Sequence, residues 1–312
     1  MSSPSIPHPQ RTARPKRSRL YWREAFEGYA FILPVVLGLL IWTTFPMVAS
    51  LVISFTDYPI LKSPEWVGLQ NYIDIFTRPT LRVLHSLRIT LTYAFVAVPL
   101  SLIAALGAAL LLNQKLAGMN FFRTTFYMPT IVPGLATAFV WGWLLNPNVG
   151  LVNELLKRLG LPEGEWFTGT ESALPTLIAL AVWGIGPTMV VFLAGLQAIP
   201  ESLYEAAKID GASDPQQFWN ITLPQLSPTI FFNLITGIIG AFQYFLTAYV
   251  LTNGGPLFAT FFYNLNLYEK AFKWQQMGLA SAMAWVMFAI ILVFTLILFR
   301  FSDALVYYEV KK

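Results

Sequence analysis

Few side chains in this sequence could do covalent chemistry. The 312 residues contain no cysteine and only two histidines, His8 and His85. A thiolate nucleophile, a disulfide framework and a metal site built from cysteine and histidine are therefore excluded. The phosphate-binding pattern G-x-x-x-x-G-K-[ST] is absent as well, so the chain cannot cradle a nucleotide by that route. We expect no catalytic residue and no metal site.

Uncharged polar side chains are the remaining candidates, and they recur in one long apolar run. On a helical wheel they fall within an arc of about 100°. The arc contains Thr229, Asn233, Thr236, Gly240, Gln243, Tyr244 and Thr247. Amides can donate and accept hydrogen bonds, and a tyrosine ring can stack on a sugar. Asn233, Thr236, Gln243, Tyr244 and Thr247 are therefore candidates for lining a solute pathway. Helix packing is the alternative, because small and hydroxyl residues let membrane helices approach closely.

The elements that must position these side chains are membrane-spanning helices. Hydrophobic residues make up 56% of the chain, charged residues make up 12%, and the mean hydropathy is +0.58. Six uncharged runs can each hold a span of about 20 residues. They cover residues 31–55, 89–112, 124–145, 174–196, 228–251 and 277–299. We predict an all-α polytopic membrane protein whose six-helix domain, residues 29–300, lies between tails at 1–28 and 301–312.

The interiors of these runs carry no Asp, Glu, Lys, Arg or His. Proton relays and ion-coupled pumps usually need such residues, so we expect the energy source to lie outside this chain. Helix-breaking residues interrupt the third run at 129–134 and the fourth at 183–188. Such breaks persist where freed backbone groups find protein or water partners, commonly beside a cavity, although a packing kink is the alternative.

Lysine and arginine counts predict the orientation. The side with both termini carries twelve of them and the opposite side eight, although without the N-terminal tail the count is six against eight. We therefore expect cytoplasmic termini and a cytoplasmic loop at 200–224. The sequence pI is about 9.2. Basic residues beside a span suit anionic lipid headgroups, so the bilayer is an expected partner and nucleic acid is not.

The loop at 200–224 has start and stop signals of its own. Pro200 suits a first helical position, and Gly211 suits a left-handed helix stop. Ser213 followed by Gln216 has the spacing of a capping box, and Pro224 is expected to close the second helix before the next span. The pattern predicts a helix-turn-helix that docks against another protein.

This loop resembles the EAA loop of permease subunits of bacterial ABC importers. The residues that carry the resemblance are Glu205-Ala206-Ala207, Asp210-Gly211-Ala212-Ser213 and Ile221-Thr222-Leu223-Pro224. Other stretches are similar to the carbohydrate-import branch, which includes permeases for maltose, other oligosaccharides and glycerol-3-phosphate. They are residues 54–57, 68–72, 121–129 and 249–256, with Trp141, Asn146, Pro147 and Gly150. One departure is Leu246, where many relatives have an acidic or amide residue that could contact substrate.

The resemblance implies the type I ABC importer permease fold and a location in the bacterial inner membrane. It implies that the first helix of the loop is a coupling helix seated in a groove of a cytoplasmic ATPase, with Glu205 facing an arginine there. The ATPase-coupling residues are then Glu205, Ala206, Ala207, Asp210, Gly211, Leu223 and Pro224. ATP and magnesium would be used by a separate ATPase dimer, and no cofactor would be bound by this chain. A second homologous permease and an extracytoplasmic sugar-binding protein are the other implied partners.

The function implied by the resemblance is import of a mono- or oligosaccharide by a non-enzymatic permease subunit. The same machinery importing glycerol-3-phosphate or a polyol is one alternative. An ion-coupled carrier acting alone is an alternative of another class, disfavoured by the uncharged spans.

Overall fold

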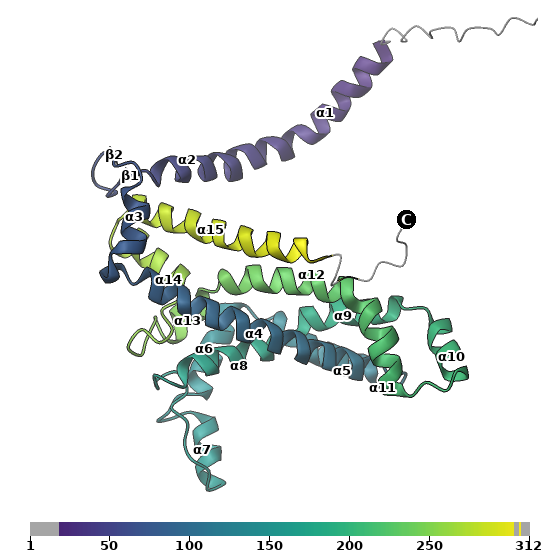
Figure 1. The fold of residues 1–312 in the computed structure, drawn as a ribbon. Helices are drawn as coiled ribbons and strands as arrows, with labels where there is room; N and C mark the ends of the chain where they lie inside the picture. Colours follow the sequence, from purple (N-terminus) through teal and green to yellow (C-terminus); the bar gives the residue numbers. More distant parts are fainter. Residues whose placement is uncertain (1–18, 303–305, 307–312) are drawn as a thin grey trace, which may run out of the picture. The chain divides into compact units, whose positions relative to one another are not determined.

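The computed structural model describes residues 19–302 and residue 306, so most of the expected tails at 1–28 and 301–312 lies outside the described residues. The chain divides into two units, residues 1–52 and 53–312. In the first unit, α1 (Arg19–Leu39) continues through a π-helical turn (Leu40–Thr44) into α2 (Phe45–Ile53) (Figure 1). This helix starts about a dozen residues before the span predicted at 31–55.

The second unit opens with a short hairpin and a small helix. Strands β1 (Thr56–Asp57) and β2 (Glu65–Trp66) pair antiparallel, with Thr56 opposite Trp66. Helix α3 (Gln70–Thr77) follows, and its Asn71 amide donates to the carbonyl oxygens of Ser54 and Thr56 at 2.9 and 2.8 Å. These bonds fix the hairpin on α3.

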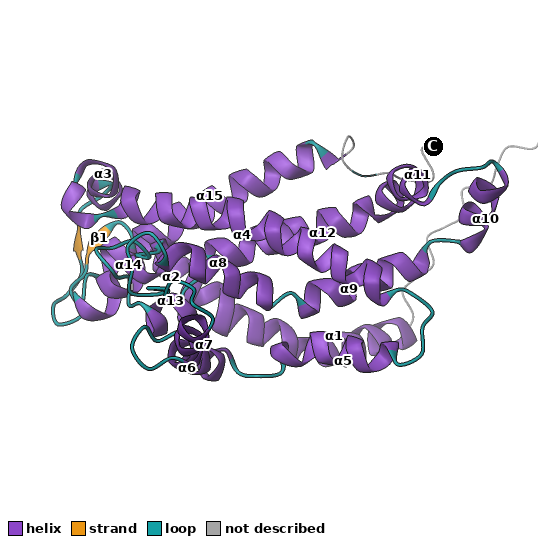
Figure 2. Ribbon diagram, turned by 90° about the horizontal axis from the view of Figure 1, so that it is seen from below, coloured by secondary structure: helices purple, strands orange, loops and turns teal. Residues whose placement is uncertain are grey.

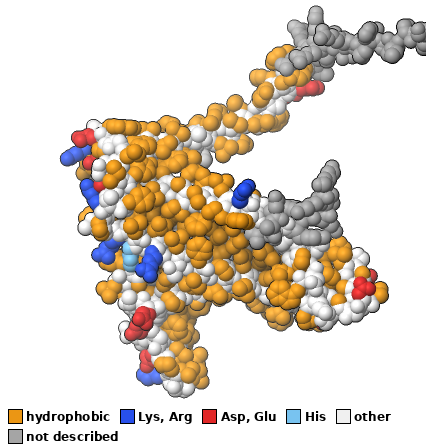
Figure 3. Space-filling model, in the orientation of Figure 1, with side chains coloured by type: hydrophobic (Ala, Val, Ile, Leu, Met, Phe, Trp, Pro, Cys, Tyr) orange, Lys and Arg blue, Asp and Glu red, His pale blue; other side chains and the backbone are white. Residues whose placement is uncertain are grey.

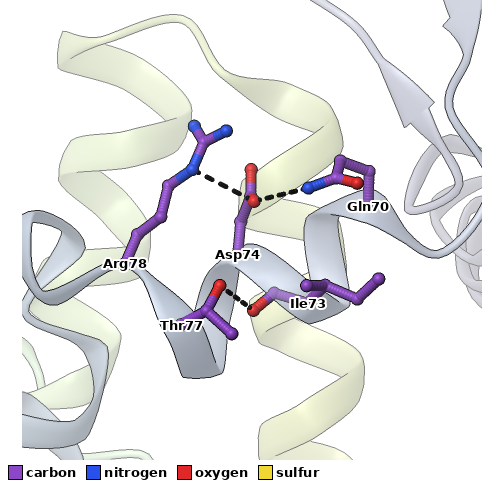
Figure 4. A network of polar contacts seen from close by, with 5 residues as sticks. All are labelled: Gln70, Ile73, Asp74, Thr77 and Arg78. Carbon is purple, nitrogen blue, oxygen red and sulfur yellow. Dashed lines mark hydrogen bonds and ion pairs between the residues drawn. The ribbon is translucent and has the colours of Figure 1, made fainter.

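A carboxylate at the centre of α3 stabilises this small helix. Asp74 is 9% exposed, accepts a hydrogen bond from Gln70 at 2.8 Å, and pairs with Arg78 at 3.1 Å, while the Thr77 hydroxyl donates to the Ile73 carbonyl (Figure 4). Because all five residues belong to one turn-rich stretch, the network orders α3 from within.

Helix α4 (Val83–Leu112) is the longest single element of the second unit and packs against α8 (Ala173–Trp183), α9 (Gly186–Ala198) and α12 (Leu223–Phe242) (Figure 1). A 3-10 turn (Pro79–Leu81) precedes it. Its N-terminal half enters the aromatic cluster, which includes Tyr93, Phe242, Phe262, Tyr263 and Met283. Its C-terminal half enters the alanine cluster, which consists of Ala105, Ala108, Ala109, Leu112, Met189, Phe192, Leu193, Leu196, Ile199 and Leu226.

The two predicted interruptions are present. Residues 124–145 form no single helix: α5 (Met119–Tyr127), a 3-10 turn (Met128–Thr130) and α6 (Gly134–Leu144) divide them. Helices α8 and α9 meet at a bend of 43°. Prolines at 129, 133 and 187 explain both, because proline lacks the N–H of a helix interior and disfavours α geometry in the residue before it.

By length and composition, four described helical runs can cross a membrane: 21–53, 83–112, 214–251 and 277–300. The bent pair α8–α9 supplies a fifth candidate, and α6 is a shorter apolar helix in the region of the third predicted span, 124–145. Helices dominate and only one two-stranded sheet is present in the described residues, so the predicted all-α polytopic membrane fold is confirmed.

The second half of the 200–224 loop differs from the prediction. Helix α11 (Asp214–Gln217) continues through a π turn (Phe218–Thr222) directly into α12, so Pro224 does not close a separate helix. The wider π turn lies where the proline ring would otherwise clash with the carbonyl four residues earlier. The π turn at 40–44 precedes Pro46 in the same way.

The predicted span at 228–251 is also interrupted. Helix α12 ends at Phe242, and α13 (Leu246–Leu251) starts after Gln243, Tyr244 and Phe245, which are outside both helices. Phe245 has φ −147° and ψ −63°, which no helix contains. A single helical wheel therefore does not apply to the whole polar arc.

The remaining elements complete the two ends of the second unit. Helix α7 (Leu151–Arg158) follows α6, while α14 (Tyr263–Tyr268), a π turn (Glu269–Lys273) and α15 (Met277–Arg300) follow α13. Helices α10 (Glu201–Ile209) and α11 lie at the end opposite α3 and α14 (Figure 2). Hydrophobic side chains cover most of the face in Figure 3, and charged side chains lie at its margins, as expected for a helical body embedded in lipid.

Candidate functional site

A cavity of about 380 Å³ lies between α4, the α8–α9 bend and α12. Its lining consists of apolar, small and uncharged polar residues. These are Tyr93, Ala97, Val98, Ser101, Leu102, Ala181, Gly184, Ile185, Thr188, Asn233, Gly237, Gly240, Ala241 and Tyr244. The glycines let the cavity reach the α12 backbone, and no lining residue carries a charge. The surface suits a neutral ligand with hydroxyl groups.

A cluster of tilted and edge-on aromatic rings forms one wall of this cavity. The Tyr93 and Tyr244 ring centroids are 4.4 Å apart, and both rings contact Phe262, at 5.2 and 5.0 Å. Tyr93 is 3% exposed and was not predicted as a site residue. The sequence marks it only as the single tyrosine in the run 89–112, and its contacts with Tyr244 and Phe262 depend on tertiary packing. The wall presents flat rings of the type that stack on sugar faces.

The five predicted pathway residues are not all at the cavity. Asn233 and Tyr244 line it. Asn233 is 5% exposed, and its amide nitrogen donates to the Thr229 carbonyl at 3.0 Å. Thr236 and Gln243 are exposed and do not line it, and the Thr236 hydroxyl donates to the Phe232 carbonyl at 2.9 Å.

Thr247 borders a second cavity, of about 210 Å³, at the broken third and fourth spans. Pro129, Gly134, Trp183 and Gly184 contribute to its lining, together with Tyr244 and Thr247. The helix breaks thus border a cavity, in agreement with one of the two readings of the sequence. Tyr244 borders both cavities because it lies in the interruption between α12 and α13.

The other predicted site is α10 and the turn that follows it. Pro200 precedes the helix with ψ 128° instead of occupying its first position, because extended geometry there lets the chain turn out of α9. Gly211 has φ +79°, the left-handed stop predicted for it. The capping box is present, and the Ser213 backbone N–H donates to Gln216 Oε1 at 2.7 Å.

The predicted coupling residues separate into two groups. Glu205, Ala206, Asp210 and Gly211 are exposed, and Ala207 is half-buried, so α10 presents a small-residue face with acidic flanks. Leu223 and Pro224 are half-buried at the start of α12. The exposed group is accessible to another protein, while Leu223 and Pro224 lie closer to the bundle.

The inner face of α10 is attached to the bundle. Leu203 and Tyr204 pack against the alanine cluster. Lys115 and Glu201 form an ion pair at 2.6 Å beside a groove of about 720 Å³. Their hydrogen bond and charge attraction raise the pKa of Lys115 and lower the pKa of Glu201. Both side chains are largely exposed, so this ion pair orients the start of α10 more than it contributes to the folding stability.

Comparison with known proteins identifies the family. Residues 97–306, more than half of the chain, match the family model described as binding-protein-dependent transport system inner membrane component. The chain belongs to this family. The predicted resemblance to ABC importer permeases is therefore confirmed.

Individual relatives agree with this assignment. The chain is 45% identical to the probable ABC transporter permease protein YesP of Bacillus subtilis, with 95% of this chain and 97% of YesP covered. It is 36% identical to the trehalose/maltose transport system permease protein MalF of Thermococcus litoralis, covering 90% and 95%. The sn-glycerol-3-phosphate permease protein UgpA of Agrobacterium fabrum is 32% identical, covering 79% and 84%.

Solved structures confirm the fold of the permease. A chain of a bacterial alginate ABC transporter, crystallised with an alginate-bound periplasmic protein, matches with a TM-score of 0.82. The two chains are 23% identical, and the match covers 95% of this permease and 100% of the other chain. This similarity shows that the permease has the ABC importer fold. Its role as an inner membrane component of a binding-protein-dependent transport system follows from the family match.

Proposed function

We propose that this permease moves a neutral mono- or oligosaccharide into the cytoplasm. The observation that carries the proposal is the uncharged cavity of α4, α9 and α12, with its tyrosine wall and the Asn233 amide. Carbohydrates are recognised through ring stacking and hydroxyl hydrogen bonds, which these groups provide. Relatives named for trehalose and maltose, starch degradation products and arabinooligosaccharides support the same substrate class.

A glycerol-3-phosphate or polyol substrate is the second candidate, favoured by the similarity to UgpA. A phosphate ester calls for lysine or arginine near the ligand. The lining of the cavity contains neither, so a phosphate would depend on cations from a second permease. An ion-coupled carrier acting alone is the weakest alternative, since family membership implies binding-protein-dependent transport.

The proposal includes partners and orientation. The exposed face of α10 would dock, in the cytoplasm, on a separate ATPase dimer that uses ATP and magnesium, with Glu205 pairing with an arginine. A second homologous permease and an extracytoplasmic sugar-binding protein would complete the importer in a bacterial inner membrane. Both termini would then be cytoplasmic, as the lysine and arginine counts favour.

The test is uptake by the purified importer in proteoliposomes, with ATP inside and the binding protein plus labelled solute outside. Asn233→Leu and Tyr244→Leu should each lower saccharide uptake about tenfold, because each removes a hydrogen-bonding or stacking group from the cavity. Thr236→Val and Gln243→Leu are the matched controls, since neither residue lines this cavity. Undiminished uptake by both cavity variants, or transport of glycerol-3-phosphate in place of saccharides, would overturn the proposal.

A further inference from the structure

The two helices of the 200–224 loop are tied together by a contact between hydroxyl groups. The Tyr204 hydroxyl on α10 and the Thr222 hydroxyl at the end of the π turn before α12 are 2.9 Å apart. Thr222 is 5% exposed, and Tyr204 is half-buried against the alanine cluster. The Thr222 side of the contact is thus shielded from water, while the Tyr204 side borders the groove beside Lys115 and Glu201. A part-buried hydrogen bond of this kind holds its geometry more firmly than one at an open surface.

Further hydrogen bonds close this contact into a ring. Thr222 Oγ1 lies 3.5 Å from the Gln217 carbonyl oxygen, and the buried Gln217 amide donates to the Ala212 carbonyl at 2.8 Å. The Ala212 N–H in turn donates to the Ala207 carbonyl at 2.8 Å, which returns to α10. The turn after Gly211 is therefore braced from both sides.

The ring of hydrogen bonds lies at the N-terminal end of α12, a helix that lines the cavity. Thr222 is the last residue of the π turn, and α12 continues from it without interruption to Asn233. At 1.5 Å per residue the distance along the helix is about 16 Å. If the ring of hydrogen bonds stays intact, a displacement of α10 would move α12 with it as one rigid body. Without the ring, the turn at 210–213 could bend, and the displacement of α10 would not reach α12.

We infer that the hydroxyls of Tyr204 and Thr222 form a transmission joint that couples movement of α10 to movement of α12 at the cavity. The inference rests on the proposed function, because it assigns the source of the movement to an ATPase docked on α10. Tyr204 and Thr222 act as positioning residues, since neither of them lines the cavity. Losing the bond should lower the amount of solute moved for each ATP hydrolysed.

The experiment measures ATP hydrolysis and saccharide uptake in the same proteoliposomes of the complete importer. Tyr204→Phe keeps the ring that packs on the alanine cluster, and Thr222→Val keeps the branched shape. Each variant should raise ATP consumed per solute imported about two- to tenfold, the range expected from the net contribution of one hydrogen bond. Because both remove the same bond, the double variant should add little to either single variant. Tyr127→Phe, at an exposed tyrosine of α5, is the matched control.

The inference would be overturned if both variants assemble normally and consume the same amount of ATP per solute imported as the parent importer. Failure of both variants to assemble would also overturn it, because the hydroxyls would then serve docking alone. An unmodified complex that hydrolyses ATP but imports no saccharide would instead contradict the proposed function. The parent measurement therefore separates the two failures.

Discussion

The two ends of α4 are held by different forces. At the aromatic cluster, buried hydrogen bonds join segments far apart in the sequence: the Asn266 amide donates to the Leu81 carbonyl at 2.9 Å, and the Tyr263 N–H donates to the Thr90 hydroxyl at 2.9 Å. The Tyr263 hydroxyl also donates to the Met283 carbonyl at 2.8 Å. Each of these buried hydrogen bonds requires a specific position of its donor and acceptor, so together they restrict this end of α4 to one arrangement.

The alanine cluster is held chiefly by close packing. Ala105 and Ala109 are fully buried in α4 and face the α9 and α12 side chains of the cluster. The polar ties are at its rim, where Arg123 donates to the Leu112 carbonyl at 2.8 Å and Tyr204 contacts Thr222. Small side chains let packed helices slide by small amounts, as in shear motions. The comparison indicates that the end of α4 at the aromatic cluster is fixed and the end at the alanine cluster is movable. We call them the fixed end and the movable end; the cavity lies between them.

The largest expected effect is at the fixed end. A Cβ on Gly278, in the first turn of α15, would overlap the Thr56 carbonyl oxygen and approach the Asn71 amide. Gly278→Ala should therefore lower the free energy of unfolding by about 3 kcal/mol, through backbone displacement. Thermal unfolding of the purified permease measures it. Gly107→Ala in α4 is the control, because no atom lies within 4 Å of the added carbon. Equal stabilities of the two variants would contradict the close approach.

A hydrogen-bond deletion at each end compares them directly. Asn266→Ala should lower the free energy of unfolding by about 2 kcal/mol, because the Leu81 carbonyl and the Ser86 hydroxyl lose a buried partner. Tyr204→Phe, at the rim of the movable end, should lower it by less than about 1 kcal/mol. Denaturant titration in detergent gives both values. The reverse order would remove the distinction between a fixed and a movable end.

Replacing Gly211 tests the turn that joins the two helices at the movable end. At φ +79° a β-branched side chain is disfavoured, so Gly211→Val should cost about 1–2 kcal/mol locally and reduce the solute imported per ATP. Gly211→Asn is the control, because asparagine tolerates the left-handed region. Uptake and ATP hydrolysis, measured together, check the prediction. Normal coupling by the valine variant would refute the assignment of α10 as the coupling helix.

Features encoded by neighbouring residues could be predicted from the sequence. The Gly211 stop, the Ser213 capping box and the breaks at 129–134 and 183–188 each depend on a few adjacent side chains, and all are present. The continuation of α11 into α12 was missed. It depends on a π turn that accommodates Pro224, and no residue pattern announces that turn.

The candidate cavity could be predicted only in part, for a related reason. Asn233 and Tyr244 were identified from a polar arc and do line it. Gln243 belongs to the same arc but is away from the cavity, because the helix ends at Phe242 and the wheel fails beyond that point. Thr236 lies within α12, but its side chain is exposed and does not line the cavity. Tyr93 was missed because its neighbours Tyr244 and Phe262 are brought to it by tertiary packing.

The smallest effect is expected from the ion pair of Lys115 and Glu201 at the movable end. Because the pKa of Glu201 is lower in the folded protein, its carboxylate contributes to folding stability above the unfolded pKa of glutamate, about 4.3. This contribution to stability is lost as the pH falls through the lower folded pKa. Because the pKa of Lys115 is higher in the folded protein, its contribution to folding stability is lost only as the pH rises through this folded pKa. Glu201→Gln should therefore lower the melting temperature slightly at neutral pH, less so in high salt, and not at all at strongly acidic pH. Glu205→Gln, one turn further along the exposed face of α10, is the control. A Glu201→Gln difference that persists below the folded pKa would show that the carboxylate charge is not its source.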